Sequence, residues 1–237
     1  MNVYHFLITV ACALIGHSTD HSYAVISSLE VEEIKLVELT EAQKFQLAST
    51  FEKVYSIEEN KLIIDYLSDV NANIGFAMYP EMKSPGAYDR KKKLIYFRES
   101  NSINYHVLVE EFFHAYQDQV IGIGNHRYDQ AFVNIEFEAK LYADIIQMKY
   151  TEYLVGELGL PIQILGSSSE SYINWLKSAT NNFSKAPDWP FMQRRYYHFL
   201  EEFSAEKTAY GKDIDYKDQP LSLFSVFNPD ELIKSRR

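Results

Sequence analysis

The chain has 237 residues, of which 46% are hydrophobic and 15% aromatic, so it can bury a sizeable core and is not a largely disordered protein. Its formal net charge is −10 and its lysines and arginines are scattered, which argues against nucleic-acid binding because phosphate contacts need a clustered basic surface. No stretch rich in Pro, Gly or Ser resembles a linker, and we therefore expect a single domain over residues 25–237.

Residues 1–24 are predicted to be a signal peptide. Residues 6–15 form an apolar run that is too short to span a bilayer easily, and Ser22-Tyr23-Ala24 offers small residues for cleavage, although residues 1–5 lack Lys and Arg. Cleavage there predicts an exported protein, periplasmic or secreted, whose mature chain has no transmembrane span and no cysteine. The alternatives are a lipoprotein anchored at Cys12 and a buried first helix.

Two amphipathic helices are predicted next. Apolar residues recur at three- and four-residue spacing over residues 40–55 and 58–70, and Thr40 with Gln43 forms the pattern of a capping box. These segments are therefore expected to pack one face against the core.

A small sheet is predicted after these helices. Residues 74–79 are a short strand candidate, and Ser84-Pro85-Gly86 is typical of a turn. Residues 92–98 are β-prone at their centre and charged at both ends, which favours an edge strand.

Two long helices are expected to follow and to pack against each other. Ser100, Asn101 and Ser102 can cap a helix, and residues 103–119 contain no Gly or Pro. A loop with Gly122 and Gly124 leads to a second helix at about 130–154. The remaining aromatic-rich chain is predicted to be helical, and its charged end, residues 228–237, to fray.

The first of these long helices contains Glu110-Glu111-Phe112-Phe113-His114. Residues four apart lie on nearly the same helical face, so Glu110 and His114 project together while Glu111 lies about 100° to one side. This is the geometry of the His-Glu-x-x-His motif, in which positions one and five hold a metal ion and position two is the general base. A carboxylate can replace the first imidazole as a ligand at a similar distance.

The second long helix contains Glu136-Phe137-Glu138-Ala139-Lys140. A strand, a motif helix and a Glu-x-Glu-Ala helix in this order resemble the gluzincin-like metallopeptidases, most nearly the CAAX-type endopeptidases and the repressor-cleaving metallopeptidases of mobile elements. The resemblance implies an α+β, zincin-like fold, mostly helical, with a small sheet whose edge strand precedes the motif helix. It also implies Glu136, rather than Glu138, as the third metal ligand. Lys140 stands where those families have Asp or Asn.

The resulting expectation is an exported metallohydrolase, a metallopeptidase, in which Glu110, His114 and Glu136 hold the ion. Glu111 would deprotonate water, and a peptide substrate would pair with the edge strand at residues 92–98. Zinc is the expected metal, and a carboxylate-rich ligand set also suits Mn or Fe. Two carboxylates bring the charge at the ion near zero, which makes it a weaker Lewis acid than one held by two His and one Glu.

Other interpretations of the same residues stay open. Glu110 with His114, and Glu136 with Lys140, have the spacing of ordinary helix-surface pairs worth about 0.2–0.5 kcal/mol. The competing functional hypothesis is a non-catalytic, zincin-derived binding module. A diiron site would need Glu-x-x-His twice, and serine-hydrolase and P-loop motifs are absent from the sequence. Three further histidines are weaker candidates: His106 as an extra ligand or proton donor, His126 in the inter-helix loop, and His198 in the core or at its rim.

Overall fold

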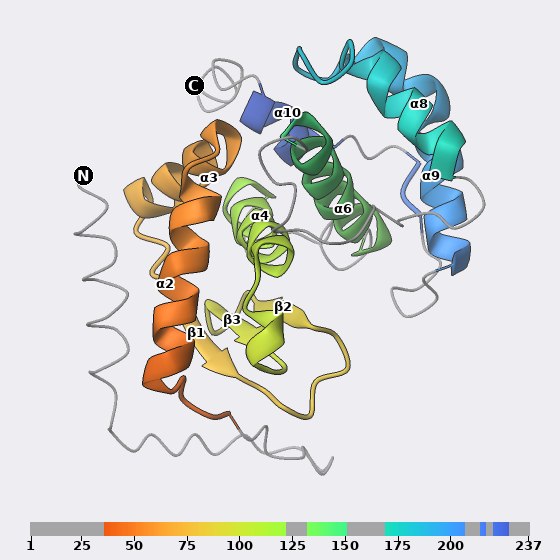
Figure 1. The fold of residues 1–237 in the computed structure, drawn as a ribbon. Coiled ribbons are helices and arrows are strands. Elements are labelled where there is room, and N and C mark those ends of the chain that lie inside the picture. The colour runs from red at the N-terminus through yellow and green to blue at the C-terminus, as the bar shows by residue number, and fades with distance from the viewer. Residues whose placement is uncertain (1–35, 122–131, 151–168, 207–213, 217–219, 228–237) are drawn as a thin grey trace.

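The computed structural model describes residues 36–121, 132–150, 169–206, 214–216 and 220–227. These residues form seven α-helices and one three-stranded sheet, which confirms the predicted α+β class, mostly helical with a small sheet. Figure 1 shows the sheet packed beneath the central helix α4 (Tyr105–Ile121). The expectations for the signal peptide, Cys12, Gly122, Gly124 and His126 concern residues outside the described part of the chain.

Helices α2 (Glu41–Tyr55) and α3 (Glu58–Asp69) correspond to the two predicted amphipathic helices. Thr40 caps α2: its hydroxyl accepts a hydrogen bond from Gln43 N at 3.4 Å, and Gln43 Oε1 accepts one from Thr40 N at 2.9 Å. This reciprocal pair satisfies backbone N–H groups that have no partner within the helix. Helix α2 packs on α4, where the ring of Phe51 meets the edge of Phe112 at 5.8 Å between centroids.

The sheet contains β1 (Gly75–Met78), β2 (Gly86–Asp89) and β3 (Leu94–Phe97), in the order β1-β3-β2. Strand β3 pairs in parallel with β1 and antiparallel with β2. The expectation that residues 92–98 form the edge strand is therefore wrong, because β3 is central. Its Ile95 and Phe97 are fully buried, and the flanking charges belong to the turn before the strand and to its end.

The edge strand beside α4 is β2, a strand that was not predicted from the sequence. Gly86, expected in a turn, is its first residue. An added Cβ atom at this position would lie 2.3 Å from Val107 Cγ1 of α4, well inside contact distance. Glycine is therefore what allows the strand to lie so close to the helix, and this close approach places β2 against the motif residues.

Helix α4 begins at Tyr105, later than the predicted residue 103. Ser100–Ser102 form a short 3₁₀ helix instead of capping side chains, and Asn104 Oδ1 accepts a hydrogen bond from Val107 N at 3.2 Å. Asn104 thus satisfies an early N–H group of α4. Helix α6 (Phe132–Lys149) ends before the predicted residue 154.

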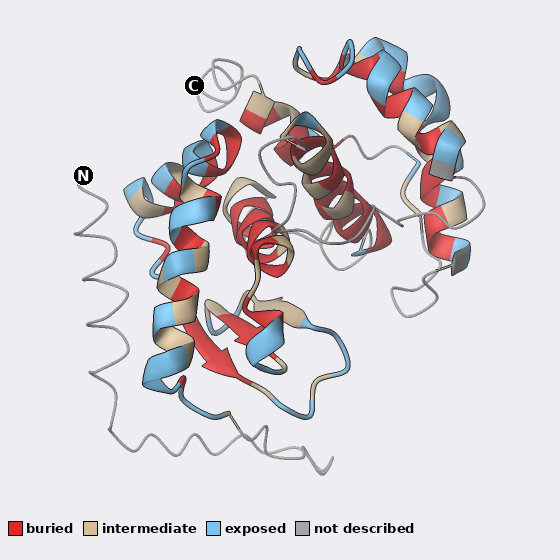
Figure 2. Ribbon diagram, viewed as in Figure 1, coloured by how far each residue is buried: buried red, intermediate tan, exposed pale blue. Residues whose placement is uncertain are grey.

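Helices α4 and α6 lie side by side at the centre of the core. The rings of Phe113 and Tyr142 stack between them, with centroids 4.4 Å apart. Figure 2 shows that most residues of both helices are buried. Functional side chains on these two helices are therefore held by core packing and not by loops.

The remaining helices form a layer against α6. Helices α8 (Ser169–Ala179) and α9 (Trp189–Glu206) pack on each other, and Phe203 of α9 contacts Phe137 of α6 at 5.5 Å between ring centroids. Helix α10 (Leu221–Phe227) contacts α3, α4 and α6. Among the described helices, none has the length and apolar character needed to cross a membrane.

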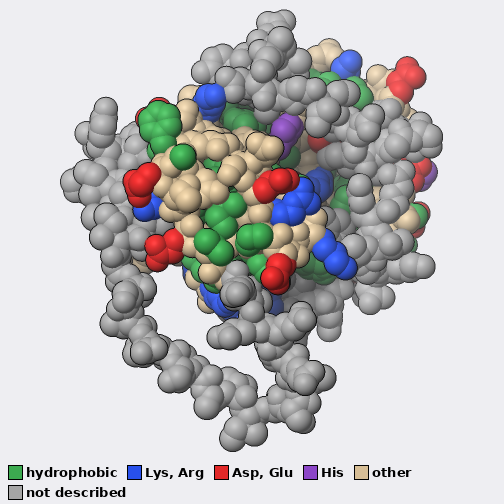
Figure 3. Space-filling view, turned by 60° about the horizontal axis from the view of Figure 1, so that its bottom comes forward, with side chains coloured by type: hydrophobic (Ala, Val, Ile, Leu, Met, Phe, Trp, Pro, Cys, Tyr) green, Lys and Arg blue, Asp and Glu red, His purple; other side chains and the backbone are tan. Residues whose placement is uncertain are grey.

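The described surface in Figure 3 carries acidic and basic side chains next to one another. That the protein does not bind nucleic acid stays a prediction. That its fold is zincin-like also stays a prediction.

Candidate metal centre

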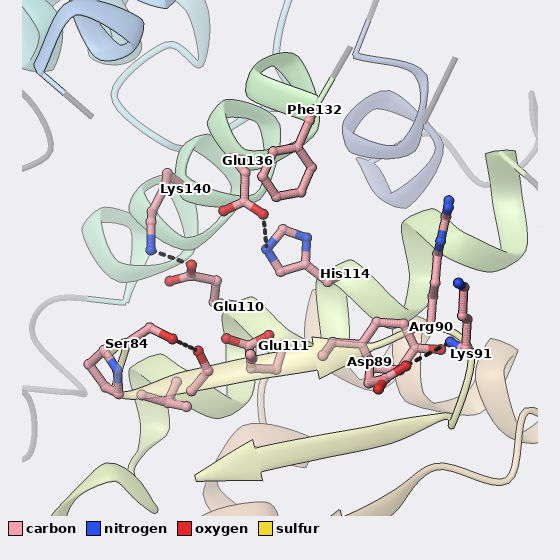
Figure 4. A pocket seen from close by; sticks show the side chains of 15 residues that line it. Ser84, Asp89, Arg90, Lys91, Glu110, Glu111, His114, Phe132, Glu136 and Lys140 are labelled. Carbon is pink, nitrogen blue, oxygen red and sulfur yellow. Dashed lines mark hydrogen bonds and ion pairs between the residues drawn. The ribbon is translucent and has the colours of Figure 1, made fainter. Parts of the chain in front are cut away.

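Three side chains of the two central helices converge on one side of α4. Glu110 and His114 lie one turn apart on α4, and Glu136 approaches them from α6 (Figure 4). One ligand atom from each residue lies within 4.8 Å of the others. The structure thus brings together the three residues predicted as ligands, and this group could hold a metal ion.

The orientation of the His114 ring is set by Gln117. Gln117 Nε2 donates to the backbone oxygen of Ile135 at 3.0 Å and to Glu138 Oε2 at 2.9 Å, so the NH₂ end of this amide faces two acceptors. Its oxygen consequently lies 2.9 Å from His114 Nδ1. Because that oxygen can only accept, Nδ1 carries the proton, and Nε2 of the neutral ring keeps a lone pair.

Nε2 of His114 faces a carboxylate. It lies 3.6 Å from Glu136 Oε1, and both side chains are buried, with exposed fractions of 7% and 11%. Two acceptors that face each other in a buried site need a proton on one of them or a metal ion between them. Burial raises the pKa of Glu136, a shift that the charge of His114 opposes and that of Glu110 reinforces. The donor set therefore fits a divalent cation.

Glu138, the alternative third ligand, has different contacts. Its Oε2 accepts from Gln117, and its Oε1 accepts from the backbone N–H of Leu223 in α10 at 2.8 Å. Positions 136 and 138 point about 200° apart on a helix. Glu138 therefore supports the residue that orients His114, while Glu136 lies beside His114, the placement expected of a third ligand.

Glu111, the predicted general base, projects between α4 and β2. It is 5% exposed, and within the described residues no donor reaches its Oε2 atom. Burial, together with the negative charges of Glu110 and Glu136, raises the pKa of Glu111 well above its ordinary value. The charge of Lys140 and a hydrogen bond from the backbone N–H of Tyr88 oppose that shift. Glu111 thus presents one uncommitted carboxylate oxygen in a desolvated position.

A pocket of about 490 Å³ opens between β2, α4 and α6 and is lined by Glu110, Glu111, His114 and Glu136. Two backbone groups of β2 point toward the pocket. The carbonyl of Gly86 accepts from Ser84 Oγ at 2.8 Å, and the N–H of Tyr88 binds Glu111. Alternate residues of β2 therefore turn their backbone groups away from β3 and toward the site.

A positive side chain also reaches the site. The ammonium of Lys140, one turn after Glu136 on α6, forms an ion pair with Glu110 Oε1. The spacing in the sequence suggested Glu136 as its partner, whereas this contact joins α6 to α4.

Comparisons of the chain with protein-family models, curated proteins and solved structures find no match. Membership of the gluzincin-like metallopeptidases therefore stays a prediction. The indication of function has to come from the chemistry of the site itself.

The other histidines have different surroundings. His106 packs its ring against Tyr105 in the first turn of α4 and is not part of the ligand group found in the described residues. His198 is 54% exposed and lies 3.5 Å from Glu202, which makes it a rim residue.

Sequence reasoning missed the part of the site that belongs to β2. The N–H of Tyr88 binds Glu111, and a Cβ atom added to Gly86 would lie 3.2 Å from Glu111 Oε1. All four residues of this strand are half-buried, so no alternation of buried and exposed residues marked it. The orienting role of Gln117 was missed as well. Its position three residues after His114 on the same helix was the available signal.

Proposed function

We propose that the protein is a zincin-like metallohydrolase, and specifically a metallopeptidase. One observation carries this proposal: Nε2 of His114 and the carboxylates of Glu110 and Glu136 converge beside Glu111, whose buried Oε2 atom has no hydrogen-bond partner among the described residues. A converging ligand group beside a base that keeps one carboxylate oxygen without a hydrogen-bond partner is the arrangement that metal-assisted hydrolysis needs.

Glu110, His114 and Glu136 would hold the ion, with zinc expected and Mn or Fe as alternatives. A divalent cation at this place would polarise a substrate carbonyl and make a nearby water more acidic. Glu111 takes one proton from the attacking water at Oε2 and passes it to the leaving amine nitrogen, so the carboxylate is regenerated at the end of the cycle. Its raised pKa suits a group that has to hold a proton during the reaction.

The substrate would be a peptide in an extended conformation. Strand β2 is at the sheet edge and borders the pocket, so an added strand could pair with its backbone. Such pairing would displace Ser84 Oγ from the carbonyl of Gly86. The substrate is therefore proposed to pair with β2 and not with residues 92–98, because β3 already has a neighbouring strand on each side.

Metal content of the purified protein tests the ligand assignment. We expect a stoichiometric ion in the wild type and less of it in each of Glu110→Ala, His114→Ala and Glu136→Ala. His198→Ala, on the exposed face of α9, is the matched control and should retain the ion. A wild type without metal after supplementation with zinc, manganese and iron would exclude the metallohydrolase.

Substitution of Glu111 tests the chemistry separately from the binding. Glu111→Gln is expected to keep the fold and the metal and to abolish cleavage of a peptide library. Cleavage that persists in this variant would remove Glu111 from the mechanism.

A second candidate is a non-catalytic binding module derived from the same scaffold. The ion pair between Lys140 and Glu110 favours it, because an ammonium already supplies positive charge to the carboxylates. A well-folded protein that binds no metal and cleaves no peptide would support this candidate.

The predicted export is a further part of the proposal. It places the site in the periplasm or outside the cell, and N-terminal sequencing of the mature protein should find a start near Val25. An intact Met1, or a lipid on Cys12, would contradict cleavage at this point.

A further inference from the structure

Lys140 contacts one of the groups that would bind the ion. Its ammonium pairs with Glu110 Oε1, and the two side chains are 25% and 18% exposed. Glu110 is also a member of the converging ligand group. An ammonium and a divalent ion that approach the same carboxylate repel each other in a poorly screened site, so each weakens the binding of the other.

Lys140 has a second carboxylate within its reach. Asp144 lies one further turn along α6, at the spacing at which helix side chains meet. It is 3% exposed and accepts a hydrogen bond from Tyr172 at 2.8 Å. Burial raises the pKa of Asp144 well above its ordinary value, and the hydrogen bond from Tyr172 and the charge of Lys140 oppose that shift. The lysine is thus close enough to act on this carboxyl group as well.

We propose that Lys140 is a built-in competitor for the metal site, whose ammonium occupies Glu110 in the metal-free protein and is displaced toward Asp144 when a divalent cation binds. The inference rests on the proposed function, because it assigns the residue that sets the metal affinity of the same site. Lys140 is therefore a positioning residue. It determines the concentration of metal at which the site fills, and it takes no part in the chemistry.

The test is the dissociation constant for Zn²⁺, measured on the metal-stripped full chain by competition with a chelating dye. Removal of the competing charge in Lys140→Met should tighten binding by about tenfold or more, because a unit charge at contact distance is poorly screened here. Lys140→Gln, which can still hydrogen-bond Glu110, should also bind more tightly. Lys140→Arg, which keeps the charge, should resemble the wild type.

Lys149→Met is the matched control. Lys149 lies on the same helix and also pairs with a glutamate, Glu59, with 33% of its side chain exposed. This variant should leave the dissociation constant unchanged. The displaced ammonium lowers the pKa of Asp144 as it approaches and so favours the ionised carboxylate. Asp144→Asn cannot supply this counter-charge and should therefore weaken Zn²⁺ binding. Circular dichroism of every variant confirms that the fold is retained.

The outcomes separate this inference from the proposed function. Equal Zn²⁺ affinity in the wild type, Lys140→Met and Lys140→Gln overturns the competition and leaves the metal site in place. Binding by the two uncharged variants but not by the wild type supports the competition and overturns the metallohydrolase. No binding by any of them overturns both.

Discussion

Gln117 is the residue on which the orientation of His114 depends. It is fully buried and connects Nδ1 of His114 to Glu138 and to the backbone of α6. Partners of this kind fix the tautomer of a histidine ligand, and their loss typically lowers metal affinity by about 10- to 100-fold. We expect this loss in Gln117→Leu, together with a decrease of about 1–3 kcal/mol in unfolding free energy from the unsatisfied groups left behind.

Zn²⁺ titration and urea unfolding measure these two effects. Gln119→Leu, a partly exposed residue of the same helix, is the control and should change neither quantity appreciably. An unchanged Zn²⁺ affinity in Gln117→Leu would mean that core packing alone orients the imidazole.

Asp144 is expected to make the free energy of unfolding depend on pH. Burial raises the pKa of Asp144 in the folded state above its value in the unfolded state. The resulting stability is fully present below the unfolded pKa and is lost as pH rises through the folded pKa. Asp144→Asn removes this titration and keeps an acceptor for Tyr172. Relative to the wild type, the variant should therefore gain unfolding free energy as pH rises above about 4.

Urea unfolding between acidic and mildly alkaline pH checks this expectation. The gain should approach roughly 1.4 kcal/mol per pH unit between the two pKa values. Glu111 and Glu136 titrate in both proteins and cancel in the difference. An unfolding free energy that differs by the same amount between the wild type and Asp144→Asn at every pH would show that Asp144 is ionised in the folded protein.

The sequence predicted part of the site at this scale. Helical periodicity alone placed Glu110 and His114 on one face, because that relation is local. The approach of Glu136 came from the family resemblance, since it depends on how two helices pack. The pairing of Lys140 with Glu110 was not predicted, because a flexible side chain can reach acceptors on either of two helices and sequence spacing favours only the one on its own helix.

At the scale of elements, the contact between β2 and α4 depends on Gly86. An added methyl group would meet Val107 Cγ1 at 2.3 Å, and valine has little rotamer freedom in a helix. Gly86→Ala should therefore push the strand away from Glu111, lower peptide turnover and cost about 1–3 kcal/mol of unfolding free energy.

A double-mutant cycle tests this contact. Val107→Ala removes the clashing atom, so the double variant should recover much of the loss, with a coupling energy of about 0.5–3 kcal/mol. Gly75→Ala in β1 is the comparison: its new Cβ atom meets Cδ2 of Leu94, the far end of a flexible side chain, at 2.5 Å. Purely additive losses would show that Gly86 does not control the approach of β2.

Local sequence patterns predicted where single helices and strands lie in the chain. They did not predict which elements pack or pair with one another. The capping box at Thr40 marked the start of α2, because its hydrogen bonds join residues three apart. The position of β3 within the sheet was wrong, since its pairing with both β1 and β2 brings together segments that the local pattern does not relate. Charged residues at the ends of Leu94–Phe97 suggested an edge, although the buried interior of this strand decides its place.

At the scale of the whole molecule, a bound metal ion should stabilise the fold. Binding to the folded state alone adds about 2.7 kcal/mol of unfolding free energy at a ligand concentration 100 times the dissociation constant. Zn²⁺ should therefore raise the melting temperature of the wild type and of His198→Ala, and leave that of His114→Ala unchanged. Differential scanning calorimetry measures the shift, and an equal shift in His114→Ala would place the ion elsewhere.

The fold class was predictable from the whole sequence, whereas the arrangement of its last helices was not. The aromatic residues of α8 and α9 indicated helices that form core. Their packing as a layer on α6, and the contact of α10 with Glu138, join residues far apart in the chain. Such contacts are set by the shape of the assembled core and leave no periodic signal in the sequence.

Lys140, which pairs with Glu110, also affects whether the protein can fold before it binds a metal ion. Many small metal sites assemble only when the ion arrives, because their unpaired ligands oppose folding without it. Here α6 brings its own counter-charge to α4, so the two helices can dock as soon as they are synthesised. Under the proposed function, the fold would form without the ion, and metal binding would be a separate, later step.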